Sequence, residues 1–402
     1  MNSTALTRLR SVLQAHVDQG LLPGAVALVH HRGRTVLHEA VGLLQPRVGS
    51  AATDASAPTA TGTAATPMAP DALFRIYSMT KPVASLVAMM LMEEGRLLLS
   101  HPISHYLPAF AGQQVHGGTT HTTHTTPREA TVHDLLRHTA GLSYAWDAGP
   151  VPSAYLAARI GSRRHSNAQL AAALGPLPLV HAPGTCWEYS RATDVLGAVL
   201  EVIEGVPLGT LLQRRVFGPL GMHDTGFSVP APQQHRVAEP FARDPQSGAT
   251  VALIDVSEPP VFESAGGGLV STAADYARFL QLLLGRGTTA TTDAGAGLHS
   301  APLRLLSGAT VDFMTADHLG HLPRAGDILP MGYGFGLGVA VRTATGQATR
   351  PGSAGHYTWS GLGGTCFFVD PAEDLFAILL TQAPGQLRYL CELFPALVYA
   401  AL

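Results

Sequence analysis

The sequence predicts an α/β protein of the α+β kind, in which an antiparallel sheet flanked by helices adjoins a mostly helical lobe. Strand patterns cluster near both chain ends, helical patterns fill the middle, and 46% of the 402 residues are hydrophobic, enough for a large core. We therefore expect a discontinuous sheet domain from residues 1–80 and 325–402, and a helical domain with loop insertions from residues 81–324.

The N-terminal elements follow from residue periodicity. Residues 6–17 carry apolar side chains at helical spacing, and residues 24–42 predict two strands around a turn at Arg32-Gly33. Residues 50–70 are rich in Ala, Thr and Pro and carry one charge, so they can bury little surface. We interpret residues 48–70 as a flexible surface insertion. Residues 74–97 then predict a helix that starts near Ser78.

A second polar stretch, residues 111–130, is also interpreted as a flexible surface insertion. Its histidines, His116, His121 and His124, could suggest a metal site. We favour a solvated loop, because no carboxylate or cysteine lies between or directly beside them. We expect neither a metal nor a cofactor.

Helices dominate the middle of the chain. Residues 131–142 predict a helix capped by Thr131 and ended by Gly141. Near the C-terminus, residues 364–382 predict two strands around Asp370-Pro371. The other predicted helices cover residues 194–204, 208–217, 272–284 and 386–402.

The bulk composition excludes several classes of protein. A net charge of −3 without a basic stripe argues against a nucleic-acid partner. Three widely spaced cysteines favour neither a disulfide framework nor a zinc site. The first twenty residues lack an apolar leader, and the longest apolar run is about half of a membrane span. We expect a cytoplasmic protein without membrane contact; the sequence leaves the oligomeric state open.

Ser78 and Lys81 are the strongest candidates for chemistry. Residues three apart share a helix face, so both side chains should lie together in the first helical turn. Of the 25 basic residues, Lys81 is the only lysine. A serine hydroxyl needs a base to remove its proton. Arginine cannot serve near neutral pH, but a buried lysine can. The position of the one lysine therefore favours catalysis over chance spacing.

At this point the sequence resembles the serine β-lactamase and penicillin-binding-protein superfamily, and within it the family VIII carboxylesterases of class C β-lactamase fold. "SMTKP" matches the S-x-x-K element. Further blocks occur in the family's order: "TVHDLLRHTAGL", "PGTCWEYSRATDVLGAVLE", "VFGPLGMHDTGF", "GGGLVSTAADYARFL", "YGFGLGV" and "WSGLGGTCFFVDP". The resemblance covers almost the whole chain apart from the insertions.

The resemblance implies roles for individual residues. Ser78 would be the acylated nucleophile and Lys81 its partner. Tyr189 would be a phenolate-like base, held in that form by Lys81. The backbone N–H groups of Ser78 and Leu362 would form the oxyanion hole. A strand that passes close to the substrate would carry the other implied substrate-binding residues, which are Trp359, Ser360 and Gly361.

Two positions depart from the lactamase pattern. Arg191 replaces the asparagine of Y-x-N, and would either contact substrate, point to solvent, or lie near Lys81 and lower the pKa of its amine. Trp359 replaces the lysine of K-T-G, so the cation that meets a lactam carboxylate is missing.

These departures favour a serine hydrolase of short- to medium-chain carboxylic esters, acting through an acyl-enzyme on a small-molecule ester. An acyltransferase of the same architecture is the nearest alternative. A β-lactamase or DD-peptidase comes third, and a non-catalytic sensor module fourth.

Overall fold

The structure is a computed structural model of the chain and describes residues 1–46, 66–117, 122–146, 148–289 and 302–402. Its helices are α1 Ser3–Asp18, α2 Thr80–Glu93, α3 Val132–Leu136, α4 Pro150–Ala157, α5 Asn167–Leu174, α6 Ala192–Glu204, α7 Leu208–Leu212, α8 Gly218–Leu220, α9 Ala273–Leu284, α10 Gly308–Met314 and α11 Leu387–Tyr399. Its strands are β1 Gly24–His31, β2 Arg34–Gly42, β3 Phe74–Arg75, β4 Gln114–His116, β5 Thr123–Thr125, β6 Val270–Ser271, β7 Tyr333–Phe335, β8 Ala340–Arg342, β9 Tyr357–Gly361, β10 Thr365–Asp370 and β11 Leu375–Thr381.

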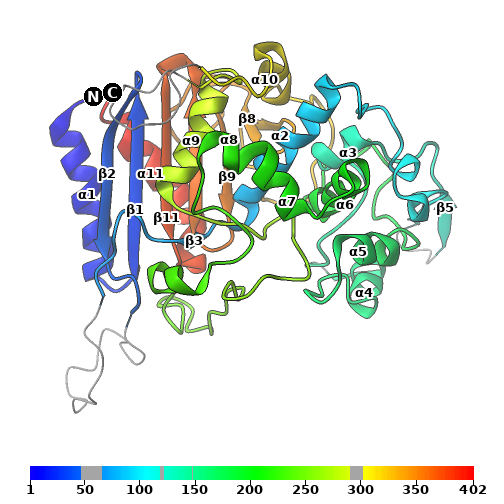
Figure 1. Ribbon diagram of the computed structural model, residues 1–402, viewed down its shortest axis with the longest axis horizontal. Helices are drawn as coiled ribbons and strands as arrows, with labels where there is room; N and C mark the ends of the chain where they lie inside the picture. Colours follow the sequence, from blue (N-terminus) through cyan, green and yellow to red (C-terminus); the bar gives the residue numbers. More distant parts are fainter. Residues whose placement is uncertain (47–65, 118–121, 147, 290–301) are drawn as a thin grey trace.

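Both ends of the chain build one antiparallel sheet, as the sequence predicts. The strand order is β2-β1-β11-β10-β9-β8-β7, so the N-terminal hairpin pairs directly with the C-terminal one (Figure 1). Ala25 lies opposite Thr381 and His31 opposite Leu375. The turn at Arg32-Gly33 has positive φ at both residues, which suits a tight hairpin.

Helices cover both faces of this sheet. On one face α1 and α11 bury apolar side chains such as Leu13 and Phe394 against the strands. On the other face α2 and α9 connect the sheet to the helical part of the core. Helix α9 packs on β1 and β11 of the sheet, although the sequence predicts it within the helical domain of residues 81–324. Helix α2 is buried on every side over its first twelve residues, because its sequence carries almost no polar surface.

Several predicted elements differ from the observed ones. Residues 74–79 are not helical from the start: β3 comes first, and a 3₁₀ turn, Tyr77–Met79, leads into α2. Helix α3 is capped by Thr131 as predicted, in a capping box with Asp134, but it ends at Leu136, because His138 takes a left-handed φ of 57°. The predicted helix over residues 208–217 is α7 followed by a π-helical segment.

The two predicted insertions are only partly described. Residues 47–65 lie outside the described residues, but Met68 just after them is buried in the core and its N–H donates to the Gly42 carbonyl. In residues 111–130 the structure places the β4–β5 hairpin, whose strand β4 is tied to Leu179 by backbone hydrogen bonds. That stretch is therefore more than a solvated loop. His121 lies outside the described residues.

In the described part of the chain, no single helix is long and apolar enough to cross a membrane; α6 with residues 208–220 passes that test only as a pair bent by 75°.

Candidate active site

Ser78 lies on the 3₁₀ turn between β3 and α2, in a strained stretch of backbone. Tyr77 has φ 43°, which non-glycine residues rarely adopt. Its conformation is stabilised because its hydroxyl accepts a hydrogen bond from the Ile254 N–H at 3.0 Å. Gly363 leaves room for the ring, since a Cβ there would lie 3.1 Å from it. This strained turn fixes the position of Ser78 at the start of α2.

Lys81 is completely buried one turn along, and its amine meets three oxygens. Nζ lies 3.3 Å from Ser78 Oγ, 2.9 Å from the Tyr144 hydroxyl and 2.7 Å from the Gly266 carbonyl. The carbonyl can only accept, so one N–H must point to Gly266. A neutral amine has one further N–H and a lone pair for the two hydroxyls. Lys81 can therefore donate to Tyr144 and accept from Ser78.

The surroundings of Lys81 favour this neutral form. Burial lowers the pKa of Lys81 to about 7, the Asp194 carboxylate raises it in part, and the Arg191 guanidinium lowers it. A substantial fraction of Lys81 is therefore unprotonated near neutral pH. That charge state allows the amine to remove the proton of Ser78.

Tyr189 lies beside this pair and is also buried. The Trp359 indole N–H donates to its hydroxyl at 3.2 Å, and Lys81 Nζ lies 4.4 Å from the centre of its ring. Burial raises the pKa of Tyr189, and hydrogen bonds with Ser78 and Trp359 offset only part of that rise. Burial thus favours the phenol form of Tyr189 over the expected phenolate-like form, and the Lys81 amine lies over the ring rather than at the hydroxyl.

Tyr144 belongs to the same cluster and was not identified from the sequence. Besides its contact with Lys81, its ring stacks on Trp146 with centroids 4.5 Å apart. Burial raises the pKa of Tyr144 well above its usual value. It lies in a connection without helical or strand periodicity, so no pattern placed it near Ser78. Its position two residues beyond the "HTAGL" block was the only signal.

The Arg191 side chain does not lie where a contact with substrate would place it. Its guanidinium pairs with the Asp194 carboxylate at 3.2 Å and lies 5.1 Å from the centre of the Tyr144 ring. Asp194 in turn accepts from the Ser264 hydroxyl and the Gly266 N–H. Of the alternatives that the sequence left open, the structure therefore favours a place near Lys81, where the charge of Arg191 lowers the pKa of the amine.

The strand β9 brings Trp359 and Gly361 to the site but turns Ser360 away. Trp359 pairs across the sheet with Phe367, and both belong to the core on the α2 side. Ser360 pairs with Cys366 and interacts with Cys391 of α11 on the other face. The expectation of a substrate contact from the Ser360 side chain is therefore wrong, since successive side chains of a strand alternate between faces.

The end of β9 lies against the Ser78 turn. A Cβ at Gly361 would lie 2.2 Å from the Ile76 carbonyl oxygen, so only glycine allows this approach. Leu362 follows directly, with its side chain 57% exposed. An oxyanion hole from the N–H groups of Ser78 and Leu362 remains a prediction. Trp359 is only 5% exposed, so its indole mainly holds Tyr189 and offers substrate little surface.

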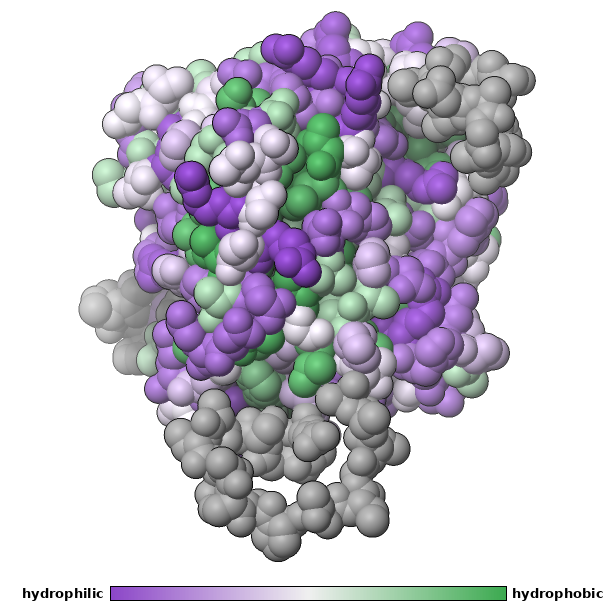
Figure 2. Space-filling model, turned by 90° about the vertical axis from the view of Figure 1, so that its left-hand side faces the viewer, coloured by the Kyte–Doolittle hydropathy of each residue, from purple (hydrophilic) through white to green (hydrophobic). Residues whose placement is uncertain are grey.

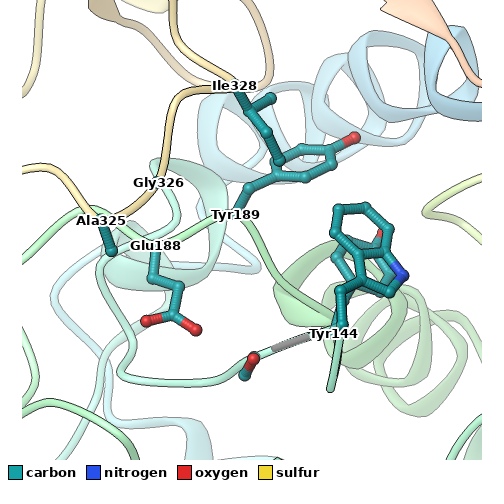
Figure 3. A pocket seen from close by; sticks show the side chains of 8 residues that line it. Tyr144, Glu188, Tyr189, Ala325, Gly326 and Ile328 are labelled. Atoms are coloured by element: carbon teal, nitrogen blue, oxygen red, sulfur yellow. The ribbon is translucent and has the colours of Figure 1, made fainter. Parts of the chain in front are cut away.

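An open pocket with about 340 Å³ of empty space, part of it continuous with solvent, adjoins Tyr189 (Figure 3). Among the described residues, no group of histidine, cysteine and carboxylate side chains is arranged to hold a metal ion. The residues that line the pocket are Ser143, Tyr144, Trp146, Glu188, Tyr189, Ala325, Gly326 and Ile328.

Comparison with known proteins agrees with this geometry. The model of the family described as Beta-lactamase matches residues 9–401. A Mycobacterium tuberculosis protein named only Rv1367c is 37% identical, covering 91% of this chain and 87% of its own length. Esterase EstB of Burkholderia gladioli is 30% identical over 93% of this chain and 90% of its own.

Solved structures share the fold along the whole chain. EstCE1, a hydrolase with promiscuous acyltransferase activity, matches with a TM-score of 0.74 and 25% identity over 99% of this chain and 98% of its own. Simvastatin synthase (LovD) from Aspergillus terreus matches with a TM-score of 0.75 and 22% identity over 98% of each chain. The chain therefore belongs to the Beta-lactamase family and has the β-lactamase-like fold predicted from its sequence.

Proposed function

We propose that this protein is a serine carboxylesterase that cleaves short- to medium-chain esters through an acyl-enzyme on Ser78. Family membership and an esterase relative at 30% identity support the broader class, a serine ester hydrolase or acyltransferase. The observation that carries the proposal is the buried Lys81 amine, 3.3 Å from Ser78 Oγ and with its pKa lowered to about 7.

The first half of the proposed reaction is acylation. Neutral Lys81 takes the Ser78 proton as the oxygen attacks the ester carbonyl. The negative charge then develops on the carbonyl oxygen, at the N–H groups proposed as the oxyanion hole. Tyr189, kept as a phenol by burial and hydrogen-bonded to Ser78, donates its proton to the leaving alkoxide. The Lys81 ammonium then restores the Tyr189 proton, which returns Lys81 to its neutral form.

Deacylation repeats these steps with water as the nucleophile. Neutral Lys81 takes the proton of the water as it attacks, Tyr189 donates its proton to the departing Ser78 oxygen, and the Lys81 ammonium then restores the Tyr189 proton. An alcohol in place of water would give an acyltransferase. That alternative is supported by the similarity to EstCE1, a hydrolase with promiscuous acyltransferase activity. The exposed apolar side chains at the pocket, Trp146 and Ile328, favour binding of such an alcohol.

For this chain, we expect lactam hydrolysis to be less favoured than ester hydrolysis. A β-lactam presents a carboxylate near the scissile bond, and the K-T-G lysine that would meet it is replaced by Trp359. A carboxylate desolvated without a partner costs several kcal/mol. We therefore expect esters without a carboxylate to react much faster than penicillins or cephalosporins.

The test compares kcat/KM for p-nitrophenyl butyrate with that for a chromogenic cephalosporin on one preparation. The ester should be preferred by at least about a hundredfold, which corresponds to roughly 2.7 kcal/mol. The Ser78→Ala variant controls for hydrolysis by a contaminant and should lose both activities. An equal or higher kcat/KM for the cephalosporin would overturn the esterase proposal in favour of a lactamase.

A further inference from the structure

The pocket beside Tyr189 has a wall of aromatic rings. Trp146 stacks on Tyr144 with an interplanar angle of 8°, and its ring centre lies 6.0 Å from that of Tyr189. Trp146 is 61% exposed and Ile328 is 41% exposed, so both keep apolar surface for a bound group. In Figure 3, Tyr144 and the Glu188 carboxylate lie on different sides of the pocket.

Glu188 gives this pocket a negative charge. Its backbone N–H donates to the His138 carbonyl at 2.9 Å, which fixes the residue next to Tyr189. One carboxylate oxygen, Oε2, lies 2.9 Å from His181 Nε2, and the side chain is 15% exposed. The hydrogen bonds found among the described residues leave Oε1 without a partner. Glu188 is also the only carboxylate among the described residues that line the pocket.

No described cation that could neutralise this carboxylate lines the pocket. Lys81 is fully buried among Ser78, Tyr144 and Gly266. Arg191 lies against the Tyr144 ring and is bound to Asp194. His181 is the one titratable partner of Glu188, and it uses only one carboxylate oxygen. A bound group thus meets π faces and a carboxylate oxygen in the same space.

This combination suits a cation. Aromatic faces attract ammonium groups through their quadrupole, and walls of such rings are how proteins recognise quaternary ammonium ligands. A carboxylate nearby adds charge attraction, which is stronger when partly shielded from solvent. A substrate carboxylate would instead be repelled.

We infer that the pocket formed by Tyr144, Trp146, Glu188 and Ile328 binds an ammonium-bearing part of the ester, so that cationic esters are preferred over neutral ones of the same shape. This inference rests on the proposed esterase function and names its substrate class. The ester carbonyl lies at Ser78 while the cationic group lies against Trp146 and Glu188.

The test uses an isosteric pair, acetylcholine and 3,3-dimethylbutyl acetate, which differ by a nitrogen in place of a carbon. We expect kcat/KM to be about tenfold higher for acetylcholine. Glu188→Gln should reduce this ratio severalfold, because the amide keeps the size but loses the charge. Glu39→Gln, an exposed position on the edge strand β2, changes net charge equally and should leave the ratio unaltered.

Binding to Ser78→Ala separates recognition from turnover. Calorimetry should show acetylcholine binding more tightly than the neutral isostere, and Glu188→Gln in that background should reduce the difference severalfold. Hydrolysis of both esters at equal rates, or a ratio unaffected by Glu188→Gln, would overturn the inference but leave the esterase proposal intact. If Ser78→Ala bound the cation selectively but the wild-type protein cleaved no ester, the result would support the pocket and overturn the proposed function instead.

Discussion

Lys81 is the residue on which the proposed chemistry depends most. Burial disfavours its charged form, while Gly266 and Tyr144 fix the direction of its amine. Burial therefore makes it easier for the amine to lose its proton, and the two hydrogen bonds orient it. An arginine at this position would keep the charge but could not release a proton near neutral pH.

Replacing Lys81 tests whether proton transfer is its role. Lys81→Arg should lower kcat/KM for p-nitrophenyl butyrate by at least about a hundredfold, as should Lys81→Ala, because general-base catalysis contributes 10²–10⁴-fold. Circular dichroism and thermal melts check that both variants fold. If Lys81→Arg retained more than roughly a tenth of the wild-type kcat/KM, Lys81 would be serving as a fixed positive charge rather than as a base.

The Lys81 pKa also sets a pH dependence. Because the neutral amine is the active form, kcat/KM should rise through a limb near pH 7 and level off above it. The Arg191 cation lowers this pKa, so Arg191→Gln should move the limb to higher pH. Arg191→Lys keeps a positive charge and should leave the limb closer to its original position. If the limb did not move in Arg191→Gln, the pH dependence would not arise from the pKa of Lys81.

At the scale of elements, the site forms where β9 meets the 3₁₀ turn that carries Ser78. A side chain at Gly361 cannot fit against the Ile76 carbonyl, and Gly266 touches the Asp194 carboxylate in the same way. Gly361 thus sets how closely β9 approaches the Ser78 turn, and Gly266 sets how closely its own loop approaches α6. Ser78 and the strand beside it are thus brought together by a contact with the backbone.

Gly361→Ala should therefore damage the site through the backbone. The added methyl would force β9 away from Ile76, and we expect kcat/KM to fall by at least about tenfold, as for other small displacements of reacting groups. Gly346→Ala is the matched control, because a Cβ there meets nothing within 4 Å. A Gly361→Ala variant with wild-type kcat/KM and melting temperature would contradict the close approach.

At the scale of the whole molecule, the sheet separates structural support from chemistry. Among the described residues, the core cluster on the α1–α11 face includes none of the residues around Ser78, whereas the α2–α9 face leads to Ser78. Leu13→Ala on the first face should destabilise folding by about 2–5 kcal/mol, the usual cost of emptying a buried leucine site. Its activity per folded molecule should be unchanged, and the exposed Arg8→Ala should alter neither. Denaturant unfolding and active-site titration measure the two effects; a kinetic defect in folded Leu13→Ala would contradict this separation.

The sequence predicted the parts that depend on local patterns. The terminal strands, α1, α6, α9 and α11 all follow from periodicity, and the Ser78–Lys81 spacing follows from the helical turn. Contacts between distant segments were out of reach: Tyr144 meets Lys81 across 63 positions, and the indole of Trp359 reaches Tyr189 across 170. Ser360 was misplaced because a motif gives residue types but not the face of the strand on which each side chain lies.

The central claim is that Ser78 carries the acyl group. The most direct measurement is the intact mass of the protein after rapid acid quenching of a reaction with p-nitrophenyl butyrate, followed by peptide mapping. The account predicts one added butyryl group on the peptide containing Ser78, and none in Ser78→Ala. A butyryl group on another residue, or turnover by Ser78→Ala at the wild-type rate, would contradict it.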